Sequence, residues 1–325
     1  MHREGLLPSI LNATFVRPAK FYLGGFYNIP HVKYYYVFLC FVYIMTVLGN
    51  GFLLSVIYLV KTLHTPKYII VFNLAFIDLC GSTALIPKLL DTFLFNRRYI
   101  VYEACLSYLF FVFFFGSLQS WTLVTMAYDR LIAICFPLRY NSIITTTSVV
   151  AILLFSWISL LIVFAVYVGL LNRLSFCGSI VIQSFFCDHG PIYRLACNDT
   201  SINFIMGLLA FTIIICIPLV LIAMSYVSIY IVLRKTTSRE ERRRAWKTCI
   251  AHLILIALFF LPYLGTNLAV LISNIHPNAR IINASLSHTV ASLLNPIIYS
   301  LKTEEVVNAI RKLSKRKIIK NITTK

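Results

Sequence analysis

The stretch Met126-Ala-Tyr-Asp-Arg-Leu-Ile-Ala-Ile-Cys-Phe-Pro-Leu-Arg-Tyr140 decides how the rest of the chain is interpreted. It follows an apolar, aromatic run from Ala104 to Thr125 that contains no charged side chain, so Asp129 and Arg130 lie where a hydrophobic span meets water. Charged side chains at the edge of hydrocarbon are costly unless they are paired or functional. The two residues are therefore either the polar flank of a membrane span or a charged pair that controls a conformational change.

The composition excludes a soluble globular domain, because the mean hydropathy is +0.84 and only 12% of the residues are charged. Apolar stretches near the roughly 20-residue length of a bilayer-spanning helix recur along the chain. They cover residues 34–60, 68–90, 104–128, 147–171, 202–233, 248–273 and 281–301. We therefore expect an all-α membrane protein with one seven-transmembrane helix bundle at 34–301, an N-terminal tail at 1–33 and a further segment at 302–325.

The distribution of basic residues predicts the orientation of this bundle. Of the 29 Lys and Arg residues, 19 fall in the loops on one side of the predicted spans and in the segment 302–325. The positive-inside rule then places the C-terminus in the cytosol and the N-terminus outside, as expected for a multi-pass plasma-membrane protein. No continuous apolar core precedes Tyr34, so the first span itself is expected to act as the membrane signal. The net charge of +18 therefore reflects topology and contact with membrane lipids, not nucleic-acid binding.

The two flanking segments carry further patterns. Asn12-Ala-Thr and Asn198-Asp-Thr match glycosylation acceptors on the predicted outer face, and Asn12 on a free tail is the better candidate. At the other end, apolar residues repeat at helical spacing among Lys and Arg, which predicts a short amphipathic helix on the inner leaflet. These apolar residues are Val306, Val307, Ile310 and Leu313.

Four cysteines fall on the predicted outer, oxidising face: Cys105 at the start of the third span, and Cys177, Cys187 and Cys197 in the loop after the fourth. An oxidising compartment favours two disulfides, and the sequence alone permits three pairings. A zinc site from Cys187, His189 and Cys197 is the competing interpretation, and oxidation disfavours it. We expect neither a metal site nor a cofactor.

Polar residues also occur inside the predicted spans. Asn50 lies in the first span, Asp78 in the second, Gln119 in the third and Asn295 in the seventh. A carboxylate inside a membrane is a candidate functional group by default, whereas an amide there commonly bridges helices. Asn50, Asp78 and Asn295 are expected to form a polar cluster on the bundle axis.

Prolines interrupt the last three spans at Pro218, Pro262 and Pro296. A proline inside a helix removes one backbone hydrogen bond and kinks the helix, which a bundle tolerates and can use as a hinge. Combined with the Asp129–Arg130 pair and the string Asn295-Pro296-Ile-Ile-Tyr299, the three prolines favour a protein that changes conformation.

Together these motifs resemble the odorant-receptor branch of the rhodopsin-like G-protein-coupled receptors. That family carries the signature Met-Ala-Tyr-Asp-Arg-x-x-Ala-Ile-Cys-x-Pro-Leu-Arg-Tyr, and the resemblance runs from Gly49 to Lys302. Ser225-Tyr226 near the inner end of the fifth span matches as well. Phe259-Phe-Leu-Pro262 departs from the usual sixth helix of this branch, and the departure resembles the odorant receptors of fish.

The resemblance implies roles for the residues already described. It implies the disulfides Cys105–Cys187 and Cys177–Cys197. It also implies a polar core of Asn50, Asp78, Gln119 and Asn295, which holds water or sodium in such receptors; the neutral Gln119 weighs against sodium here. The residues that it implies for the activation switch and G-protein coupling are Asp129, Arg130, Tyr226, Asn295, Pro296 and Tyr299.

The ligand pocket is expected in the outer half of the bundle. The third span offers aromatic surface and the hydroxyl of Ser117 there but no carboxylate, which argues against an amine ligand. Small-molecule sites are mostly apolar with a few placed polar groups. By family position the pocket-lining residues are Phe113, Gly116, Ser117, Met206, Ala210, Tyr263, Asn267 and His288.

The sequence therefore predicts a receptor that binds a small organic odorant and activates a stimulatory, olfactory-type heterotrimeric G protein, which raises cyclic AMP. A rhodopsin-like receptor for a peptide or lipid is the alternative within the same fold. A transporter that uses Asp78 is disfavoured because the two halves of the chain show no repeat. An enzyme is not expected, because the sequence contains no catalytic motif such as His-Glu-x-x-His or Gly-x-Ser-x-Gly.

Overall fold

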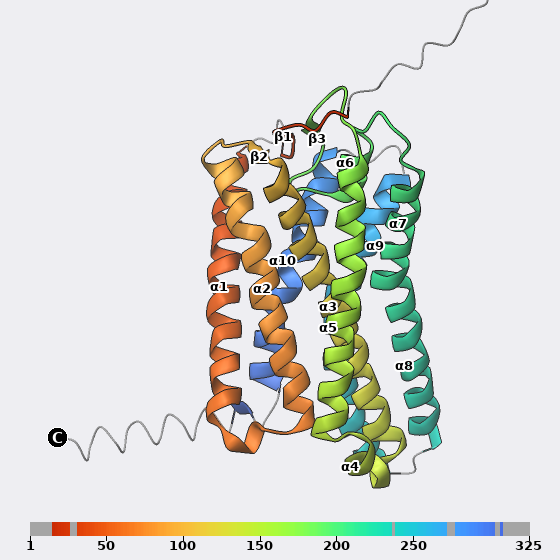
Figure 1. Ribbon diagram of the computed structural model, residues 1–325. Helices are drawn as coiled ribbons and strands as arrows, with labels where there is room; N and C mark the ends of the chain where they lie inside the picture. Colours follow the sequence, from red (N-terminus) through yellow and green to blue (C-terminus); the bar gives the residue numbers. More distant parts are fainter. Residues whose placement is uncertain (1–14, 27–30, 236–237, 272–276, 303–305, 308–325) are drawn as a thin grey trace, which may run out of the picture.

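The computed structural model describes residues 15–26, 31–235, 238–271, 277–302 and 306–307. Seven helical segments, each long and apolar enough to cross a membrane, stand side by side in one bundle (Figure 1). The seven-helix prediction is therefore confirmed. The segments are α1 (Val32–Leu59), α2 (Pro66–Leu94), α3 (Tyr102–Cys135), α5 (Thr146–Gly169) extended by η3 (Leu170–Arg173), α7 (Ser201–Phe211) continued by η4 (Thr212–Cys216) and α8 (Ile217–Lys235), α9 (Arg239–Leu271), and α10 (Pro277–Lys302).

Short elements lie between the spans and, in the case of β1, before the first span. They are η1 (Lys61–Leu63), η2 (Pro137–Arg139), α4 (Tyr140–Ile143), α6 (His189–Tyr193), β1 (Lys20–Leu23), β2 (Tyr99–Val101) and β3 (Val181–Ile182). The strands and α6 lie at one end of the bundle, here called the outer end, and α4 lies at the opposite, inner end (Figure 1). Helix α3 packs against α2, α5, α8 and α9, so it is the central helix of the bundle.

The break in the fifth span follows from Pro218. A proline has no N–H to donate to the carbonyl four residues earlier, which here is that of Ile214. The Ser120 hydroxyl of α3 donates to that carbonyl oxygen at 2.6 Å. The Trp121 indole donates to the neighbouring Ile213 carbonyl at 3.1 Å. The five-residue π-helical turn η4 is thus held open by donors from the central helix.

The kink in the seventh span is satisfied in the same way by the first span. Pro296 frees the carbonyl of Ser292, and the Asn50 amide donates to that oxygen at 3.0 Å. The preceding Gly49 allows the approach, because a Cβ at this position would lie 3.0 Å from the Pro296 ring. The pair Gly49-Asn50 therefore fits α1 to the kink of α10.

A second polar bridge joins three helices on another side of α3. The Trp157 indole of α5 donates to Asn73 Oδ1 of α2 at 2.9 Å. The Asn73 amide donates in turn to the Thr122 hydroxyl of α3 at 2.9 Å. Trp157 is thus a hydrogen-bonding contact between spans.

The outer end carries a small sheet beside the helices. Strand β1 pairs antiparallel with β2 and parallel with β3, in the order β2-β1-β3. Exposed and buried residues alternate along Lys20-Phe-Tyr-Leu23, which is the two-residue period of a strand with one covered face. Phe21 is fully buried, and its ring lies 5.2 Å from that of Phe176. Part of the expected N-terminal tail is therefore built into the outer loops.

The predicted amphipathic helix at the C-terminus is described only at Val306 and Val307. Both residues are helical, and Val306 is buried. Ile310 and Leu313 lie outside the described residues, so this helix stays a prediction.

We predict that Asn50→Leu lowers the free energy of unfolding by about 1–2 kcal/mol, because it leaves the buried Ser292 carbonyl without its donor. Thermal unfolding of the purified receptor in detergent measures the loss. Pro296→Ala supplies a backbone N–H to the same carbonyl, so Asn50→Leu should cost less in that background. An equal cost in both backgrounds would show that Asn50 does not act through this carbonyl.

Candidate functional site

The inner end of α3 holds the charged pair that the sequence singles out. Asp129 is buried, with 3% of its surface exposed. Arg130 Nη2 lies 3.7 Å from Asp129 Oδ2, and the Tyr140 hydroxyl donates to Asp129 Oδ1 at 2.8 Å. Burial and the Asp129 carboxylate raise the pKa of Tyr140, which keeps its hydroxyl protonated as a donor. Two residues of the stretch Met126–Tyr140, Arg130 and Tyr140, thus act on the Asp129 carboxylate.

Across the same end of the bundle, Tyr226 of α8 is joined to α9. Its hydroxyl lies 2.7 Å from Nδ1 of His252, which is buried at 4% exposure. His252 is not among the switch residues predicted from the sequence, although a histidine within an apolar span was a usable signal. The side chain of Tyr299, another predicted switch residue, lies outside the described part of the structure.

The four predicted core residues do gather on the bundle axis. Asp78 Oδ1 accepts from the Gln119 amide at 2.8 Å, and Asp78 Oδ2 accepts from the Asn295 amide at 2.7 Å. The Ser292 hydroxyl also donates to Asp78 Oδ1, at 3.2 Å. Asn50 joins the cluster through the Ser292 carbonyl. Helices α2, α3 and α10 therefore meet at one carboxylate, α1 is joined to it through the Ser292 backbone, and the three described partners of Asp78 are donors.

A cavity of about 20 Å³ lies beside this cluster, between α2, α3 and α10. Its volume is that of a water-sized site. Of the predicted pocket residues whose side chains the structure describes, Gly116 and His288 line it, so the cavity lies nearer the second and seventh spans than the pocket expected from family position. The lining residues are Ile77, Gly81, Leu85, Val112, Phe115, Gly116, Gln119, His288 and Ser292.

The other predicted pocket residues occupy the surrounding helices. Phe113 packs among aromatic rings of α5 and the outer loop. Ser117 donates to its own helix, to the Phe113 carbonyl at 2.6 Å. Met206 is half-buried and Ala210 is buried, both on α7. The side chain of Asn267 lies outside the described residues.

Tyr263 and His288 are brought together across α9 and α10. The Tyr263 hydroxyl lies 2.9 Å from His288 Nδ1, beside Gly116 of α3. A Cβ on Gly116 would lie 3.1 Å from that hydroxyl. Glycine at this position therefore leaves room for a polar contact over the cavity.

Two disulfides fasten the outer loop. Cys105 at the start of α3 is bonded to Cys187, and Cys177 is bonded to Cys197, with Cα separations of 5.5 and 5.8 Å. These are the pairings that the resemblance implies. The described residues contain no group of three or more His, Cys, Asp or Glu side chains arranged to hold a metal ion. Cys187 and Cys197, the two cysteines of the alternative zinc site with His189, are each in a disulfide.

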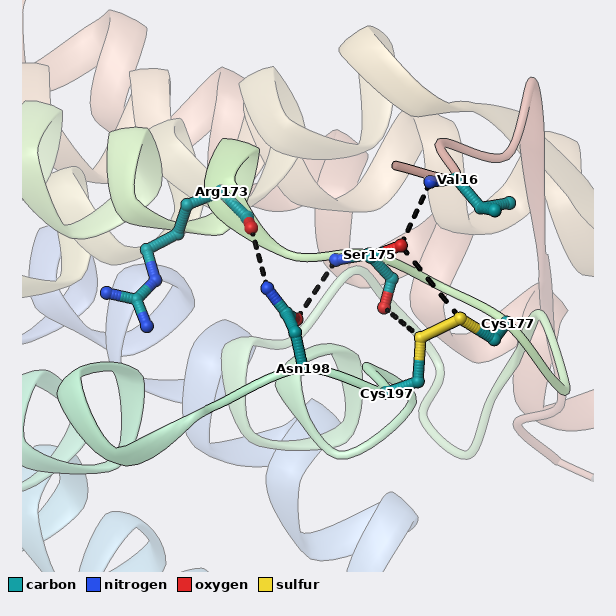
Figure 2. The surroundings of a disulfide bond; sticks show 6 residues. All are labelled: Val16, Arg173, Ser175, Cys177, Cys197 and Asn198. Atoms are coloured by element: carbon teal, nitrogen blue, oxygen red, sulfur yellow. Dashed lines mark hydrogen bonds between the residues drawn. A yellow bond between two sulfur atoms is a disulfide. The ribbon is translucent and has the colours of Figure 1, made fainter. Parts of the chain in front are cut away.

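The loop around the second disulfide is held by side chains that bond to backbone (Figure 2). The Asn198 amide donates to the Arg173 carbonyl at 2.9 Å, and Asn198 Oδ1 accepts from the Ser175 N–H at 3.1 Å. The Ser175 hydroxyl accepts from the N–H of Val16 at 2.9 Å. This network connects the N-terminal segment to the loop after the fourth span.

Asp188 and His189 follow Cys187 in the loop at the outer end of the bundle, where α6 begins. Burial raises the pKa of Asp188 to about 6, against the opposing effect of hydrogen bonds from the backbone of Gly190 and His189. Burial lowers the pKa of His189 to about 4, so its imidazole is neutral at physiological pH. His189 is 1% exposed, and its ring stacks on that of Tyr167 with centroids 4.0 Å apart. The outer end therefore contains ionisable groups that the predicted pocket did not include.

We predict that Asp78→Asn destabilises the receptor by about 1–3 kcal/mol. The new amide nitrogen would face one of three donors where an oxygen now accepts. Thermal unfolding of the purified protein measures the change, with Asp91→Asn at the surface end of α2 as the control. Asp91 is partly exposed in its pair with Lys88, so that change should cost at most about 1 kcal/mol. Equal stability of wild type and Asp78→Asn would show that the three donors do not depend on a carboxylate at this position.

Comparison with known proteins gives the family. The family model described as "Olfactory receptor" matches residues 39–317. Olfactory receptor 1 of Rattus norvegicus is 37% identical over 294 residues, which cover 90% of this chain and 93% of that protein. Olfactory receptor 1M1 of Homo sapiens is 36% identical over 285 residues, covering 87% of this chain and 90% of that protein.

The fold has a solved counterpart as well. The crystal structure of squid rhodopsin superposes with a TM-score of 0.70 at 18% sequence identity, over 87% of this chain and 86% of that chain. At this identity the likeness concerns the seven-helix fold alone. The family model and the relatives, in contrast, match most of the sequence, and they confirm the resemblance that the motifs carry. The chain belongs to the olfactory receptor family of G-protein-coupled receptors, which are signalling receptors and not enzymes.

Proposed function

We propose that this protein is an odorant receptor that binds a small, largely neutral organic molecule in the outer half of the bundle. Binding activates a stimulatory, olfactory-type heterotrimeric G protein and so raises cyclic AMP. The observation that carries the proposal is the Arg130–Asp129–Tyr140 arrangement at the inner end of α3, in a chain of the olfactory receptor family. Its outer end is extracellular and its inner end faces the cytosol, as the distribution of Lys and Arg indicates.

In the proposed mechanism, Arg130 leaves Asp129 while α9 tilts away from α3. Tyr226 is now bonded to His252 of α9, so the tilt releases its hydroxyl, which then meets Arg130. Asn295 and Pro296 provide the matching change in α10, because Asn295 bonds directly to Asp78. An odorant shifts this balance only by its difference in affinity for the two conformations.

Two further proposals concern the surroundings and the branch of the family. The apolar faces of the seven spans contact membrane lipids, and the basic segment 234–247 contacts lipid headgroups at the inner leaflet. The receptor does not bind nucleic acid. The string Phe259-Phe-Leu-Pro262 supports assignment to the branch found in fish; the relatives described above come from mammals, so the branch stays a prediction.

The first experiment measures cyclic AMP in cells that express the receptor with an olfactory-type G protein, against a broad panel of odorants. We expect a response that requires the odorant and is abolished by Arg130→Ala, since that change removes the switch cation. An N-terminal tag verifies equal surface levels. Arg139→Ala in η2, an exposed neighbouring cation outside the Asp129 contact, is the matched control and should retain most of the response.

A full odorant response in the Arg130→Ala receptor would remove this residue from the mechanism. A surface-expressed receptor that stays silent to odorants with several G proteins, but responds to peptides or lipids, would favour the receptor for a non-odorant ligand.

Glycosylation gives a separate prediction. We expect Asn12 to carry the glycan, whereas the Asn198 nitrogen to which a sugar would attach already donates to the Arg173 carbonyl. Thr14→Ala and Thr200→Ala remove the two acceptor patterns and leave both asparagines in place. On electrophoresis, Thr14→Ala should lose the band that shifts with endoglycosidase, and Thr200→Ala should keep it. The reverse pattern would show that Asn198 is the acceptor.

A further inference from the structure

Three buried polar atoms at the outer end have no hydrogen-bond partner among the described residues. They are Nε2 of His189 and both amide atoms of Asn203, Nδ2 and Oδ1. His189 is 1% exposed and Asn203 is fully buried. A buried polar group without a partner costs stability, and native structures keep few of them. A ligand that supplies the missing hydrogen bonds would explain why these residues are polar.

His189 and Asn203 belong to one interface, between α6 and α7, which pack against each other. A Cβ on Gly207 of α7 would lie 3.9 Å from His189 Nδ1, so this face of α7 meets the imidazole. Asn203 precedes Gly207 by four residues and therefore lies one helical turn away on the same face. His189 of α6 and Asn203 of α7 therefore both lie at the interface of these two helices.

This interface continues the pocket expected from the sequence. Asn203, Met206 and Ala210 are spaced by three and four residues, so they form one stripe along α7 with the polar member at the outer end. On the opposite side, the Phe113 ring lies 5.7 Å from Tyr167, whose ring stacks on His189. An aromatic wall therefore leads from the predicted pocket to the unpaired polar atoms.

The chemistry of these atoms defines the group that they would recognise. Burial keeps the His189 imidazole neutral, and a neutral imidazole offers one donor and one acceptor. The Asn203 amide also donates and accepts. The neighbouring Asp188 carboxylate is engaged by the backbone N–H groups of His189 and Gly190 and by the charge of Arg194. The complement is an uncharged group that itself donates and accepts, namely a hydroxyl or a primary carboxamide.

We propose that His189 and Asn203 form a hydrogen-bonding subsite for the hydroxyl or primary carboxamide group of an otherwise apolar odorant. The hydrocarbon part of the ligand lies along the wall formed by Phe113 and Tyr167. The inference rests on the proposed function, because it assigns a ligand class to the same pocket.

The test uses the full-length purified receptor and a matched panel of compounds: straight-chain and benzylic alcohols and primary carboxamides, each paired with its methyl ether or dimethylamide. Thermal unfolding reports binding without a G protein, and cyclic AMP in cells reports activation. We expect alcohols or carboxamides to raise the unfolding temperature and their capped partners to have little effect. Asn203→Leu and His189→Phe should each weaken that binding about tenfold, the equivalent of one hydrogen bond.

Thr212→Val is the matched control, because its hydroxyl donates within the same span on an exposed face. It should bind the panel like the wild type. Without any compound, Asn203→Leu should unfold at the same temperature as the wild type or at a higher one, since it removes two unpaired polar atoms. Unfolding at a lower temperature would mean that the amide has a structural partner, and it would overturn the subsite.

The other outcomes separate the subsite from the proposed function. Stabilisation by ethers and alcohols alike, or by no member of the panel, overturns the subsite. A cyclic AMP response to odorants without a hydroxyl or carboxamide, unchanged in Asn203→Leu, also overturns it but leaves the odorant receptor intact. Stabilisation by alcohols that Asn203→Leu abolishes supports the subsite even where no G protein responds, and in that case the signalling proposal alone is contradicted.

Discussion

The structure depends on one constraint: in hydrocarbon every polar backbone group must find a partner within the protein. Pro218 and Pro296 each leave one backbone carbonyl without its helical donor, and in this bundle a side chain of another span supplies the missing hydrogen bond. Ser120 serves the carbonyl that Pro218 frees, and Asn50 serves the carbonyl that Pro296 frees. The kinks are therefore points at which helices are joined, and a movement of the fifth or seventh span must break or carry along a bond to α3 or α1.

Helix α3 contributes residues to the cavity, to the polar core around Asp78 and to the charged pair at the inner end. Gly116 lies beside the cavity and the Tyr263 hydroxyl, and Gln119 donates to the polar core one turn further in. At the inner end of the same helix, Asp129 accepts a hydrogen bond from Tyr140. Because these residues share one rigid element, a shift of α3 at the outer end changes contacts at the inner end. The core carboxylate Asp78 binds α3 and α10 together, so both helices respond to the same change.

Much of this was predictable from sequence. The seven spans follow from apolar length, and the gathering of Asn50, Asp78 and Asn295 follows from the high cost of isolated polar groups in a membrane. Gln119 was added to them by the family resemblance. The partners were not predictable: nothing local to Ser120 indicates that it serves Ile214. Strand β1 was missed because its pairing unites three segments that are distant in the chain. Asn203 and His189 were missed because their significance lies in bonds that are not made, which only a three-dimensional structure reveals.

The pairing of β1 with β3 also has a consequence for biosynthesis. Tyr22 leaves the ribosome long before its partner Val181, and the two strands lie in register only after the first four spans have been inserted. Contacts between such distant segments form late and slowly. The disulfide between Cys105 and Cys187 likewise joins segments that are far apart in the chain, with a sequence separation of 82 residues. The outer face is therefore assembled after most of the spans are in the bilayer, and a receptor stalled before that stage would have its helices but an unfinished ligand-binding end, a form that quality control can recognise.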